Sequence, residues 1–458
     1  MTALWRSDEI AAATGGTASA PFEVTGVTFD SRELQPGDLF VAMPGTVHDG
    51  HKFVAGAFEA GAAAALVSQP VDGPHVLVDD TFAALQALGH AARERTSATI
   101  FGVTGSVGKT SSKEALYLAL DRNAPGKVHR SVKSYNNHTG VPLSLARMPR
   151  DCRYAVLEMG MNHSGEIRDL TAQIRPDVAL ITAIAPAHIE NLGSIEAIAD
   201  AKAEIFEGLE SDGIAIVPND SDQRDRLVKA ARRHADRIIT FGTGDADVHA
   251  VHAVRSEQGG SQISAALLER ELTFTIAQRG EHWVSNALAV LAAVEAIGAD
   301  VAIAGLALAD MAGLKGRGER HMIHLAEGEA LLIDESYNAN PASMAATLKS
   351  LGEEEDVARR IAVLGPMREL GEQSEQLHAG LAPAVIDGHV DRLILIGEEM
   401  RPLAESVVGK VGLDLVFTVD EAAEALQSML RSGDAVLVKA SNSVGLARLV
   451  EQVAGVAA

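Results

Sequence analysis

Cysteine, aromatic residues and positive charge are all scarce in this chain of 458 residues. The single cysteine, Cys152, excludes an internal disulfide and fits a reducing compartment. Aromatic residues make up only 4% of the chain against 47% for all hydrophobic residues, so aliphatic side chains must do most of the packing. The net charge of −23 argues against a nucleic-acid partner, because a phosphate backbone requires a basic face.

Long hydrophobic runs are missing as well. The most apolar run, residues 60–67, is far shorter than a membrane span, and residues 1–6 lack the pattern of a signal peptide. We therefore expect a cytoplasmic protein without membrane insertion. The chain is too long for one hydrophobic core, so we expect two or three domains.

The most informative motif is a glycine-rich segment, Thr104-Gly105-Ser106-Val107-Gly108-Lys109-Thr110-Ser111. It follows an apolar run that predicts a buried strand over 98–103, and it precedes a predicted helix over 113–120. Backbone N–H groups in such a turn bind phosphate, Lys109 adds a positive charge, and the Thr110 hydroxyl can reach Mg²⁺. The full pattern G-x-x-x-x-G-K-[ST] is not met, because its first glycine would fall on Val103. The flanking strand and helix still favour a nucleoside triphosphate, ATP, over an ordinary strand–helix turn.

Residues 1–96 are expected to form a first domain. Short strands are predicted at 24–30, 37–42 and 63–67, with a helix over 53–60. Polar residues gather in two turns, at 30–32 and 45–51. By themselves these turns are most simply solvated loops, and a ligand site is the alternative.

Residues 97–314 are expected to form a second domain that begins with the phosphate loop. Further apolar strands at 153–158 and 177–184 indicate a parallel sheet, in which ligands gather at the carboxyl ends of the strands. Thr110, Glu158 and His188 all lie just past strand ends, so they can converge on one metal–phosphate site. The simpler alternatives are a helix-cap or surface carboxylate for Glu158 and a loop histidine for His188.

Lys202 lies within an apolar helical stripe that runs from Ile195 to Leu209. Because its neighbours in sequence are acidic, Lys202 could be a surface lysine that buries only its aliphatic stem and keeps its ammonium in solvent. The alternative is a buried lysine whose charge is neutralised, paired or chemically changed, because an isolated buried ammonium is costly. Asn286 lies early in a helix predicted at 282–289. A contact with the nucleotide base and a position on the helix surface are equally plausible for it.

Residues 315–458 are expected to form a third domain, joined through a glycine-rich, basic connection at 313–320. Helical stretches alternate there with strands, which indicates a doubly wound α/β domain similar to a Rossmann unit, although G-x-G-x-x-G is absent. The strands are predicted at 330–334, 360–364, 392–396, 414–419 and 435–438.

Seven motifs, in order along the chain, resemble those of the Mur ligases. They are Thr104–Thr110, Asn136-Asn137, Glu158-Met159-Gly160-Met161-Asn162-His163, Ala185-Pro186-Ala187-His188, Ala201-Lys202-Ala203-Glu204-Ile205-Phe206, His282-x-x-x-Asn286-Ala287 and Asp334-x-x-Tyr337-Asn338-Ala339-Asn340-Pro341. The resemblance covers nearly the whole chain, including 30–32 and 36–42, and is greatest to the branch that adds D-alanyl-D-alanine.

The resemblance implies three α/β domains: an N-terminal domain that binds UDP-MurNAc-peptide, a central P-loop ATPase domain with a parallel sheet, and a C-terminal Rossmann-like domain. It implies that ATP phosphorylates the terminal carboxylate of UDP-N-acetylmuramoyl-tripeptide, and that the amine of D-alanyl-D-alanine then attacks the acyl phosphate. A carboxylate and a γ-phosphoryl group are both anions, so their approach requires cations such as Mg²⁺, Lys109 and the loop amides. A monomer is expected.

The resemblance also assigns roles to residues. Lys109, Glu158, His188 and Lys202 are implied in catalysis, with Lys202 carbamylated by CO₂, and Mg²⁺ is implied at Thr110, Glu158, His188 and the Lys202 carbamate. The implied ATP-binding residues are the phosphate loop, Thr104 to Ser111, with Asn286, Arg317, Asp334, Asn338 and Asn340. The implied substrate-binding residues are Ser31, Arg32, Thr46, His51, Asn136, Asn137, Asn162 and His163.

Two departures from the family pattern concern the third domain. Gly365-Pro366-Met367 stands where the family usually has Gly-Asp-Met, and Lys439-Ala440-Ser441-Asn442 stands where it usually has Lys-Gly-Ser-Arg. Three alternatives remain: a sister ligase that adds one amino acid, whose Asp-Asn-Pro-Arg motif is not found here, a folylpolyglutamate synthase, and a P-loop binding protein without ligase activity. The last would not need Glu158, His188 and Lys202 together.

Overall fold

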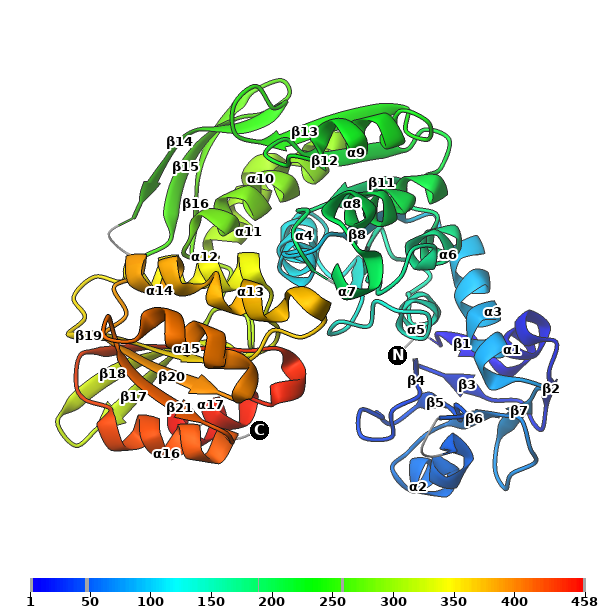
Figure 1. The fold of residues 1–458 in the computed structure, drawn as a ribbon. Coiled ribbons are helices and arrows are strands. Elements are labelled where there is room, and N and C mark those ends of the chain that lie inside the picture. Colours follow the sequence, from blue (N-terminus) through cyan, green and yellow to red (C-terminus); the bar gives the residue numbers. More distant parts are fainter. Residues whose placement is uncertain (1–2, 46–48, 188, 257–258, 456–458) are drawn as a thin grey trace.

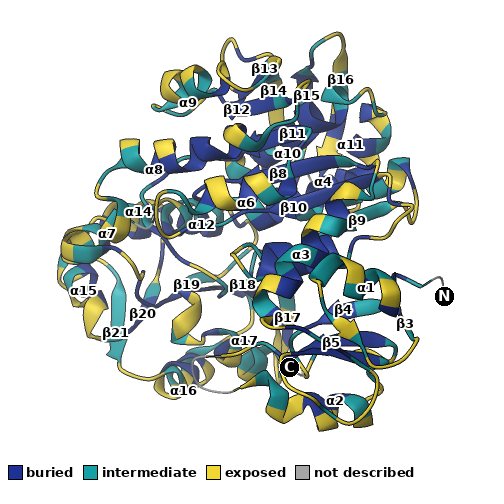
Figure 2. Ribbon diagram, turned by 90° about the vertical axis from the view of Figure 1, so that its right-hand side faces the viewer, coloured by how far each residue is buried: buried dark blue, intermediate teal, exposed yellow. Residues whose placement is uncertain are grey.

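The fold is taken from a computed structural model, which describes residues 3–45, 49–187, 189–256 and 259–455. Thr46 and His188, both expected in the site, lie outside the described residues. Three large sheets and one small two-stranded sheet organise the described residues (Figure 1), and the strands of the large sheets are mostly buried (Figure 2).

The first sheet has the strand order β2-β7-β6-β5-β4, parallel except for β2. Its apolar side chains alternate between two faces, one covered by α1 and α3 and the other by α2. A short antiparallel pair, β1 with β3, lies beside it. The elements are β1 (Trp5–Arg6), α1 (Ser7–Thr14), β2 (Thr17–Ala18), β3 (Glu23–Val24), β4 (Gly26–Thr28), β5 (Asp38–Val41), η1 (Gly50–Phe53), α2 (Val54–Glu59), β6 (Ala64–Val67), β7 (His75–Leu77) and α3 (Thr81–Glu94).

The second sheet has the order β16-β15-β14-β13-β12-β11-β8-β10-β9. Strands β8 to β14 pair in parallel, as expected, whereas β14, β15 and β16 form an unexpected antiparallel extension. The strands are β8 (Thr99–Thr104), β9 (Val128–Arg130), β10 (Tyr154–Glu158), β11 (Val178–Ile181), β12 (Ile214–Pro218), β13 (Arg237–Gly242), β14 (Val248–Arg255), β15 (Ser261–Ala266) and β16 (Glu271–Ile276).

Helices cover both faces of this second sheet. One core lies under α4, α10 and α11, and the other under α5, α6, α8 and α9. The helices are α4 (Lys109–Asn123), α5 (Gly140–Ala146), α6 (Glu166–Ile174), α7 (Ile189–Leu192), α8 (Ile195–Ala203), η2 (Glu204–Gly208), α9 (Arg224–Ala231), α10 (Glu281–Ala296) and α11 (Val301–Ala309).

Two expected elements of this part end earlier than predicted. The strand predicted over 177–184 stops at Ile181, because the Thr182 hydroxyl turns to the carbonyls of Thr104 and Val107. The helix that carries Lys202 stops at Ala203 and continues as the 3₁₀ helix η2. There the Glu204 carboxylate accepts N–H bonds from residues 165 and 168 at the start of α6, an anion at a helix N-terminus.

The third sheet has the order β17-β18-β22-β19-β20-β21, parallel except for β17. Helices α12 to α15 pack against one face, and α16 and α17 against the other. The elements are β17 (Glu319–Leu325), β18 (Gly328–Glu335), α12 (Pro341–Gly352), β19 (Arg359–Leu364), η3 (Gly371–Gln373), α13 (Ser374–Ala379), α14 (Ala382–Asp387), β20 (Arg392–Ile396), η4 (Glu398–Met400), α15 (Arg401–Val407), β21 (Gly412–Val416), α16 (Val419–Met429), β22 (Asp434–Lys439), η5 (Asn442–Val444) and α17 (Ala447–Ala454).

The strand predicted over 414–419 is shifted toward the N-terminus in the structure. Strand β21 ends at Val416 because Thr418 is the N-cap of α16, with its side chain accepting the N–H of Glu421. The predicted doubly wound arrangement is otherwise present.

The first and third parts both attach to the central one (Figure 1). Helix α3 packs against α5, and the Trp5 indole donates to the carbonyl of Ala146 at 2.8 Å. In the central part, Cys152 is buried, its thiol donates to the Tyr154 carbonyl, and burial raises its pKa to about 11. Among the described helices, none combines the length and apolar character that crossing a membrane requires.

Candidate active site

A cavity of about 350 Å³ lies where the phosphate loop faces the third part of the chain. The central part contributes the loop, the end of β11 and the start of α10. The third part contributes the connection at 316–317, the segment after β18 and the end of β22. The lining residues are Ser106, Val107, Gly108, Lys109, Thr110, Ser111, Thr182, Ala183, His282, Trp283, Ser285, Asn286, Gly316, Arg317, Glu335, Asn338, Asn340, Ala342, Ser343, Ala346, Thr347 and Lys439.

Two glycines are required for the shape of the phosphate loop. Gly105 has φ 152°, and a Cβ on it would lie 2.0 Å from the Thr182 hydroxyl. Gly108 has φ 80°, and a Cβ there would lie 2.8 Å from Oδ1 of Asn286. The loop therefore packs tightly against its neighbours, which brings Asn286 of α10 next to the first turn of α4.

Lys109 begins α4 and folds back over the loop. Its Nζ donates to the carbonyl of Gly105 at 2.7 Å, and burial lowers its pKa. The N-terminus of α4 and the Lys109 ammonium thus direct positive charge at the cavity. Such an arrangement binds the phosphates of a nucleotide.

Glu158 ends the neighbouring strand β10 and is 1% exposed. Its Oε2 accepts the Thr110 hydroxyl at 2.9 Å, and its Oε1 accepts the Asn136 amide at 2.6 Å. A hydroxyl and a carboxylate held together beside a phosphate loop are hard oxygen ligands of the kind that Mg²⁺ prefers. Thr110 and Glu158 therefore fit a divalent cation.

Lys202 is fully buried, and its Nζ has no hydrogen-bond partner among the described residues. Burial and the nearby Lys109 charge lower its pKa, while the carboxylates of Glu158, Glu166 and Glu204 act in the opposite direction. The alternative of a surface lysine with only its stem covered is therefore wrong. An unpaired ammonium at full burial is costly, so the position suits a neutral amine or a modified side chain.

The third part of the chain forms the opposite wall of the cavity, which includes Arg317, Glu335 and Lys439. The Arg317 guanidinium lies 4.3 Å from the ring centroid of Tyr337. Lys439 Nζ donates to the carbonyl of Asn338 at 2.9 Å and pairs with Glu335 at 3.2 Å. Since β18 and β22 are adjacent parallel strands in which Glu335 and Lys439 are opposite each other, both side chains emerge at the same edge of the sheet.

Two predicted ATP contacts, Asp334 and Thr104, do not line the cavity, and a third, Asn340, lines it but caps a helix. Asp334 is buried behind the cavity wall and accepts the N–H groups of Gly316 and Ser336. The Asn340 side chain lines the cavity but accepts the N–H of Ser343 as the N-cap of α12. Thr104 is buried at the end of β8, where its hydroxyl donates to the carbonyl of Met159.

The predicted substrate residues fall into separate groups. Ser31 and Arg32 lie in a turn where Arg32 pairs with Asp30 at 2.6 Å. The Arg32 side chain is largely exposed to solvent. His51 contacts Asp49 and Ser68 within the first part. The remaining four are in the central part: Asn136 contacts Glu158, the Asn137 side chain accepts N–H groups at the start of α5, and Asn162 and His163 both contact Glu166.

Sequence analysis missed some lining residues. Trp283 and Ser285 line the cavity at the start of α10, where the sequence analysis assigned only Asn286. Both lie within one helical turn of Asn286, and this spacing is the sequence feature that could have identified them. Lys439 directly follows the strand predicted at 435–438 and is the last residue of β22 in the structure, so the argument from strand ends applies to it as it does to Glu158.

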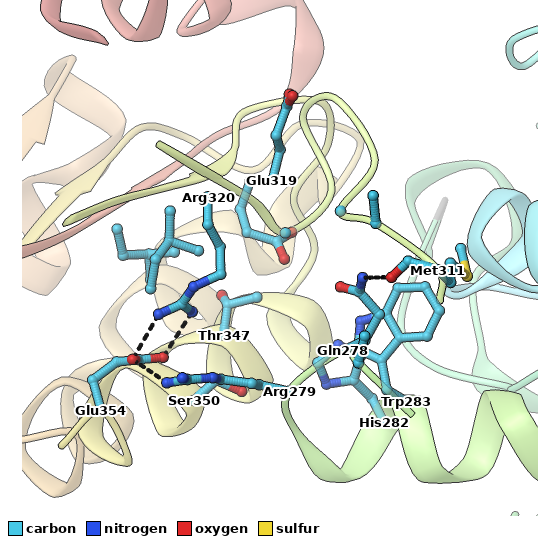
Figure 3. Close-up of a pocket in the computed structure, with 17 residues that line it drawn as sticks. Gln278, Arg279, His282, Trp283, Met311, Glu319, Arg320, Thr347, Ser350 and Glu354 are labelled. Carbon is cyan, nitrogen blue, oxygen red and sulfur yellow. Dashed lines mark hydrogen bonds and ion pairs between the residues drawn. The ribbon is translucent and has the colours of Figure 1, made fainter. Parts of the chain in front are cut away.

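A second cavity, of about 360 Å³, borders the first and shares His282, Trp283, Glu335 and Thr347 with it. Figure 3 shows Glu354 facing both Arg320 and Arg279 on its wall. Glu354 and Arg320 belong to the third part, whereas Arg279 precedes α10 in the central part. This charge cluster joins the two parts beside the candidate nucleotide site.

Comparison with known proteins gives matches along most of the chain. Three segments match Mur ligase families: residues 23–95 the "Mur ligase family, catalytic domain", residues 103–294 the "Mur ligase middle domain", and residues 316–442 the "Mur ligase, glutamate ligase domain". The chain is 35% identical over 449 residues to the UDP-N-acetylmuramoyl-tripeptide–D-alanyl-D-alanine ligase of Bacillus subtilis (strain 168), covering 95% of each chain.

Solved structures agree with these matches. The crystal structure of MurF from Acinetobacter baumannii has a TM-score of 0.84 at 30% identity and covers 99% of each chain. The MurF ligase of Thermotoga maritima, solved in complex with ADP, has a TM-score of 0.77 at 27% identity over 94% of this chain and 97% of that one. Family matches, near-full-length identity and the phosphate-loop geometry together lead to one conclusion: the chain belongs to the Mur ligase family.

Proposed function

We propose that this protein is an ATP-dependent ligase that joins D-alanyl-D-alanine to UDP-N-acetylmuramoyl-tripeptide in peptidoglycan precursor synthesis. That activity is the one in the name of the Bacillus subtilis relative. The observation that carries the proposal is a cavity lined by Lys109 and Thr110 on one side and by the third part of the chain on the other. Behind Thr110, the buried Glu158 carboxylate accepts its hydroxyl, and the unpaired Lys202 lies close enough for the Lys109 and Glu158 charges to affect its pKa.

The reaction forms an amide in two displacements. A carboxylate oxygen of the tripeptide attacks the γ-phosphorus of ATP, the bond to the bridging oxygen breaks, and ADP leaves. The dipeptide amine then attacks the acyl carbon, the bond to the phosphate oxygen breaks, and phosphate leaves while the amine loses a proton. Lys109, the loop N–H groups and Arg317 place positive charge where the phosphoryl group is transferred.

Mg²⁺ would be held by Thr110 and Glu158, and it would supply charge neutralisation between two anionic reactants. We propose that Lys202 adds to this site as a carbamate formed with CO₂. The Nζ without a hydrogen-bond partner and the lowered pKa support this, because CO₂ reacts only with the neutral amine. His188 stays a predicted ligand outside the described residues.

We assign one binding role to the part of the chain around each of the three large sheets. We propose that residues 1–96 bind the UDP-linked peptide, residues 97–314 bind ATP, and residues 315–458 close the site and bind the dipeptide. The UDP-substrate contacts are proposed at Ser31, Arg32, Thr46, His51, Asn136, Asn137, Asn162 and His163. We further propose a cytoplasmic monomer, which size-exclusion chromatography with light scattering tests directly.

The decisive assay measures phosphate release from ATP with purified protein, Mg²⁺ and UDP-N-acetylmuramoyl-tripeptide. Turnover is expected to require D-alanyl-D-alanine, and mass spectrometry should identify the UDP-linked pentapeptide. Equal turnover with a single free amino acid in place of the dipeptide would assign the chain to a sister activity instead.

A further inference from the structure

Lys113 is a second buried lysine on α4 that the proposed chemistry does not use. It lies one turn after Lys109 and Thr110, and it is among the largest fully buried side chains of the protein. Its Nζ donates to the carbonyl of Ser131 at 2.8 Å and to that of Lys133 at 2.6 Å, and it pairs with Glu114 at 3.0 Å. These three acceptors match the three N–H donors of an ammonium.

The two carbonyls belong to the loop that follows β9. Lys133 has φ 51°, a left-handed conformation that is uncommon for a residue other than glycine, asparagine or aspartate, so its carbonyl direction requires support from neighbouring contacts. The Lys113 ammonium gives that support from inside the protein.

The same loop holds the candidate metal ligand Glu158 at two points, and Lys113 lies beside the same carboxylate. The Ser131 hydroxyl accepts the backbone N–H of Glu158 at 3.1 Å, and the Asn136 amide donates to its carboxylate at 2.6 Å. Lys113 Nζ itself lies 3.8 Å from Oε2 of Glu158, the oxygen that also accepts the Thr110 hydroxyl. The position of Glu158 therefore depends on the loop.

The outer end of the loop contacts the first part of the chain. Lys133 forms an ion pair with Glu33, and the Tyr135 hydroxyl donates to the other oxygen of Glu33 at 3.0 Å. Glu33 directly follows the turn of Ser31 and Arg32, two proposed UDP-substrate residues. One loop of six residues, 131–136, thus joins the candidate metal ligand to the candidate substrate domain.

We propose that Lys113 is a positioning residue that fixes the 131–136 loop, and through it both the Glu158 carboxylate and the docking of the first domain. The expected change in the KM for the UDP-linked peptide rests on the proposed ligase function. The expected change in loop structure does not. A neutral side chain of similar length would leave the buried Ser131 carbonyl and the partly buried Lys133 carbonyl without this partner, and it would remove the charge beside Glu158.

The test compares Lys113→Met with Lys127→Met, a control lysine that is half exposed and pairs with Asp151 at the surface. Hydrogen exchange of the free protein should show at least tenfold faster exchange of the Ser131 and Tyr135 amides in Lys113→Met only. The Mg²⁺ concentration for half-maximal binding of a fluorescent ATP analogue should rise at least tenfold. The KM for UDP-N-acetylmuramoyl-tripeptide should rise similarly, with a much smaller change in the KM for D-alanyl-D-alanine.

Unchanged loop exchange or unchanged Mg²⁺ dependence in a folded Lys113→Met protein would overturn the proposal and leave Lys113 a purely structural residue. Glu33→Gln gives an independent trial if Lys113→Met does not fold. It should raise the KM for the UDP-linked peptide while Ser131 stays protected and the Mg²⁺ dependence stays as in the wild type. Loss of Ser131 protection in Glu33→Gln would show that Lys113 does not fix the loop.

The exchange and nucleotide-binding measurements need no peptide substrate. If wild-type protein makes no UDP-linked pentapeptide while Lys113→Met still releases the loop, the proposed ligase function fails and the positioning role stands. If wild-type protein makes the UDP-linked pentapeptide but loop exchange is unchanged in Lys113→Met, the ligase function stands and the positioning role fails.

Discussion

At the residue scale, the partly buried Lys109 and the fully buried Lys202 act on each other across the candidate site. The Lys109 charge contributes to the lowered pKa of Lys202, and burial is the largest cause for both residues. A carbamate on Lys202 would replace this repulsion by an attraction between an ammonium and an anion. The modification would therefore remove an unfavourable interaction between two like charges in the unmodified site.

Replacing Lys109 tests its role at the transferred phosphoryl group. Lys109→Ala should lower turnover by about 100-fold or more, as the loss of one positioned electrostatic group does. Phosphate release and circular dichroism check activity and fold, with Lys127→Ala as a surface-lysine control. Near-normal turnover in Lys109→Ala would contradict the assignment.

Replacing Lys202 tests the carbamate. Lys202→Ala should lose most activity and recover part of it with added formate or acetate, which supply the missing anion in the vacated space. Lys202→Arg should stay inactive, because a guanidinium stays charged and cannot be carbamylated. Phosphate release is measured with and without the carboxylates at matched ionic strength. Full activity in the arginine variant would rule the carbamate out.

At the element scale, the sequence predicted strands with clear apolar runs, such as β8, β10 and β11. It missed β12 and β13, although both are largely buried, and it missed the extension β14 to β16. Apolar runs such as the one that forms β8 are unambiguous, and residues at their carboxyl ends, including Glu158 and Thr110, meet in the site as expected. Strands β14, β15 and β16 alternate only partly and have exposed residues such as Val254, so the same pattern is too weak there.

The site was predictable where strand ends define it and not where long-range contacts do. Lys202 was ambiguous because acidic neighbours in sequence suggested solvent, and only packing shows that its Nζ is buried. The ends of β11 and α8 depend on Thr182 and Glu204, whose partners lie far away in the sequence. Lys113 is one helical turn from Lys109, but no local signal identifies the loop carbonyls that it binds.

The edge strand β9 carries a histidine whose state gives a pH prediction. The His129 ring contacts the carbonyl of Ser144 in α5 at 2.7 Å, and burial lowers its pKa to about 4. The unfolded chain takes up this proton near pH 6.5 while the folded chain does not, so stability is lost as pH falls from 6.5 toward 4.

His129→Gln should remove this part of the acid sensitivity. Between pH 7 and pH 5, the free energy of unfolding of the wild type should fall by about 2 kcal/mol more than that of His129→Gln. Urea unfolding followed by circular dichroism at both pH values measures the difference. Equal pH dependence in the two proteins would mean that His129 is not held neutral.

At the scale of the whole molecule, the proposed ATP contacts come from two proposed domains that the segment Gly313–Arg320 joins. Gly316 and Gly318 in this segment have φ 71° and 87°, and the Arg279–Glu354 pair beside it crosses between the domains. Split sites of this kind close on ligand binding. Small-angle scattering should show a smaller radius of gyration with ATP analogue and UDP-linked peptide bound together, and D-alanyl-D-alanine alone should have no effect. An unchanged radius would contradict closure.

The low reactivity expected of the buried Cys152 allows the proposed closure to be followed with fluorescent dyes on introduced cysteines. The Cys152 thiol faces the Tyr154 carbonyl and is almost never ionised at neutral pH, so maleimide reagents should leave the native protein unlabelled. Two cysteines introduced at exposed positions, such as Glu59 in the first domain and Glu424 in the third, would then accept a donor and an acceptor dye without any cysteine having to be removed. The distance between the outer domains becomes readable in single molecules, one turnover at a time.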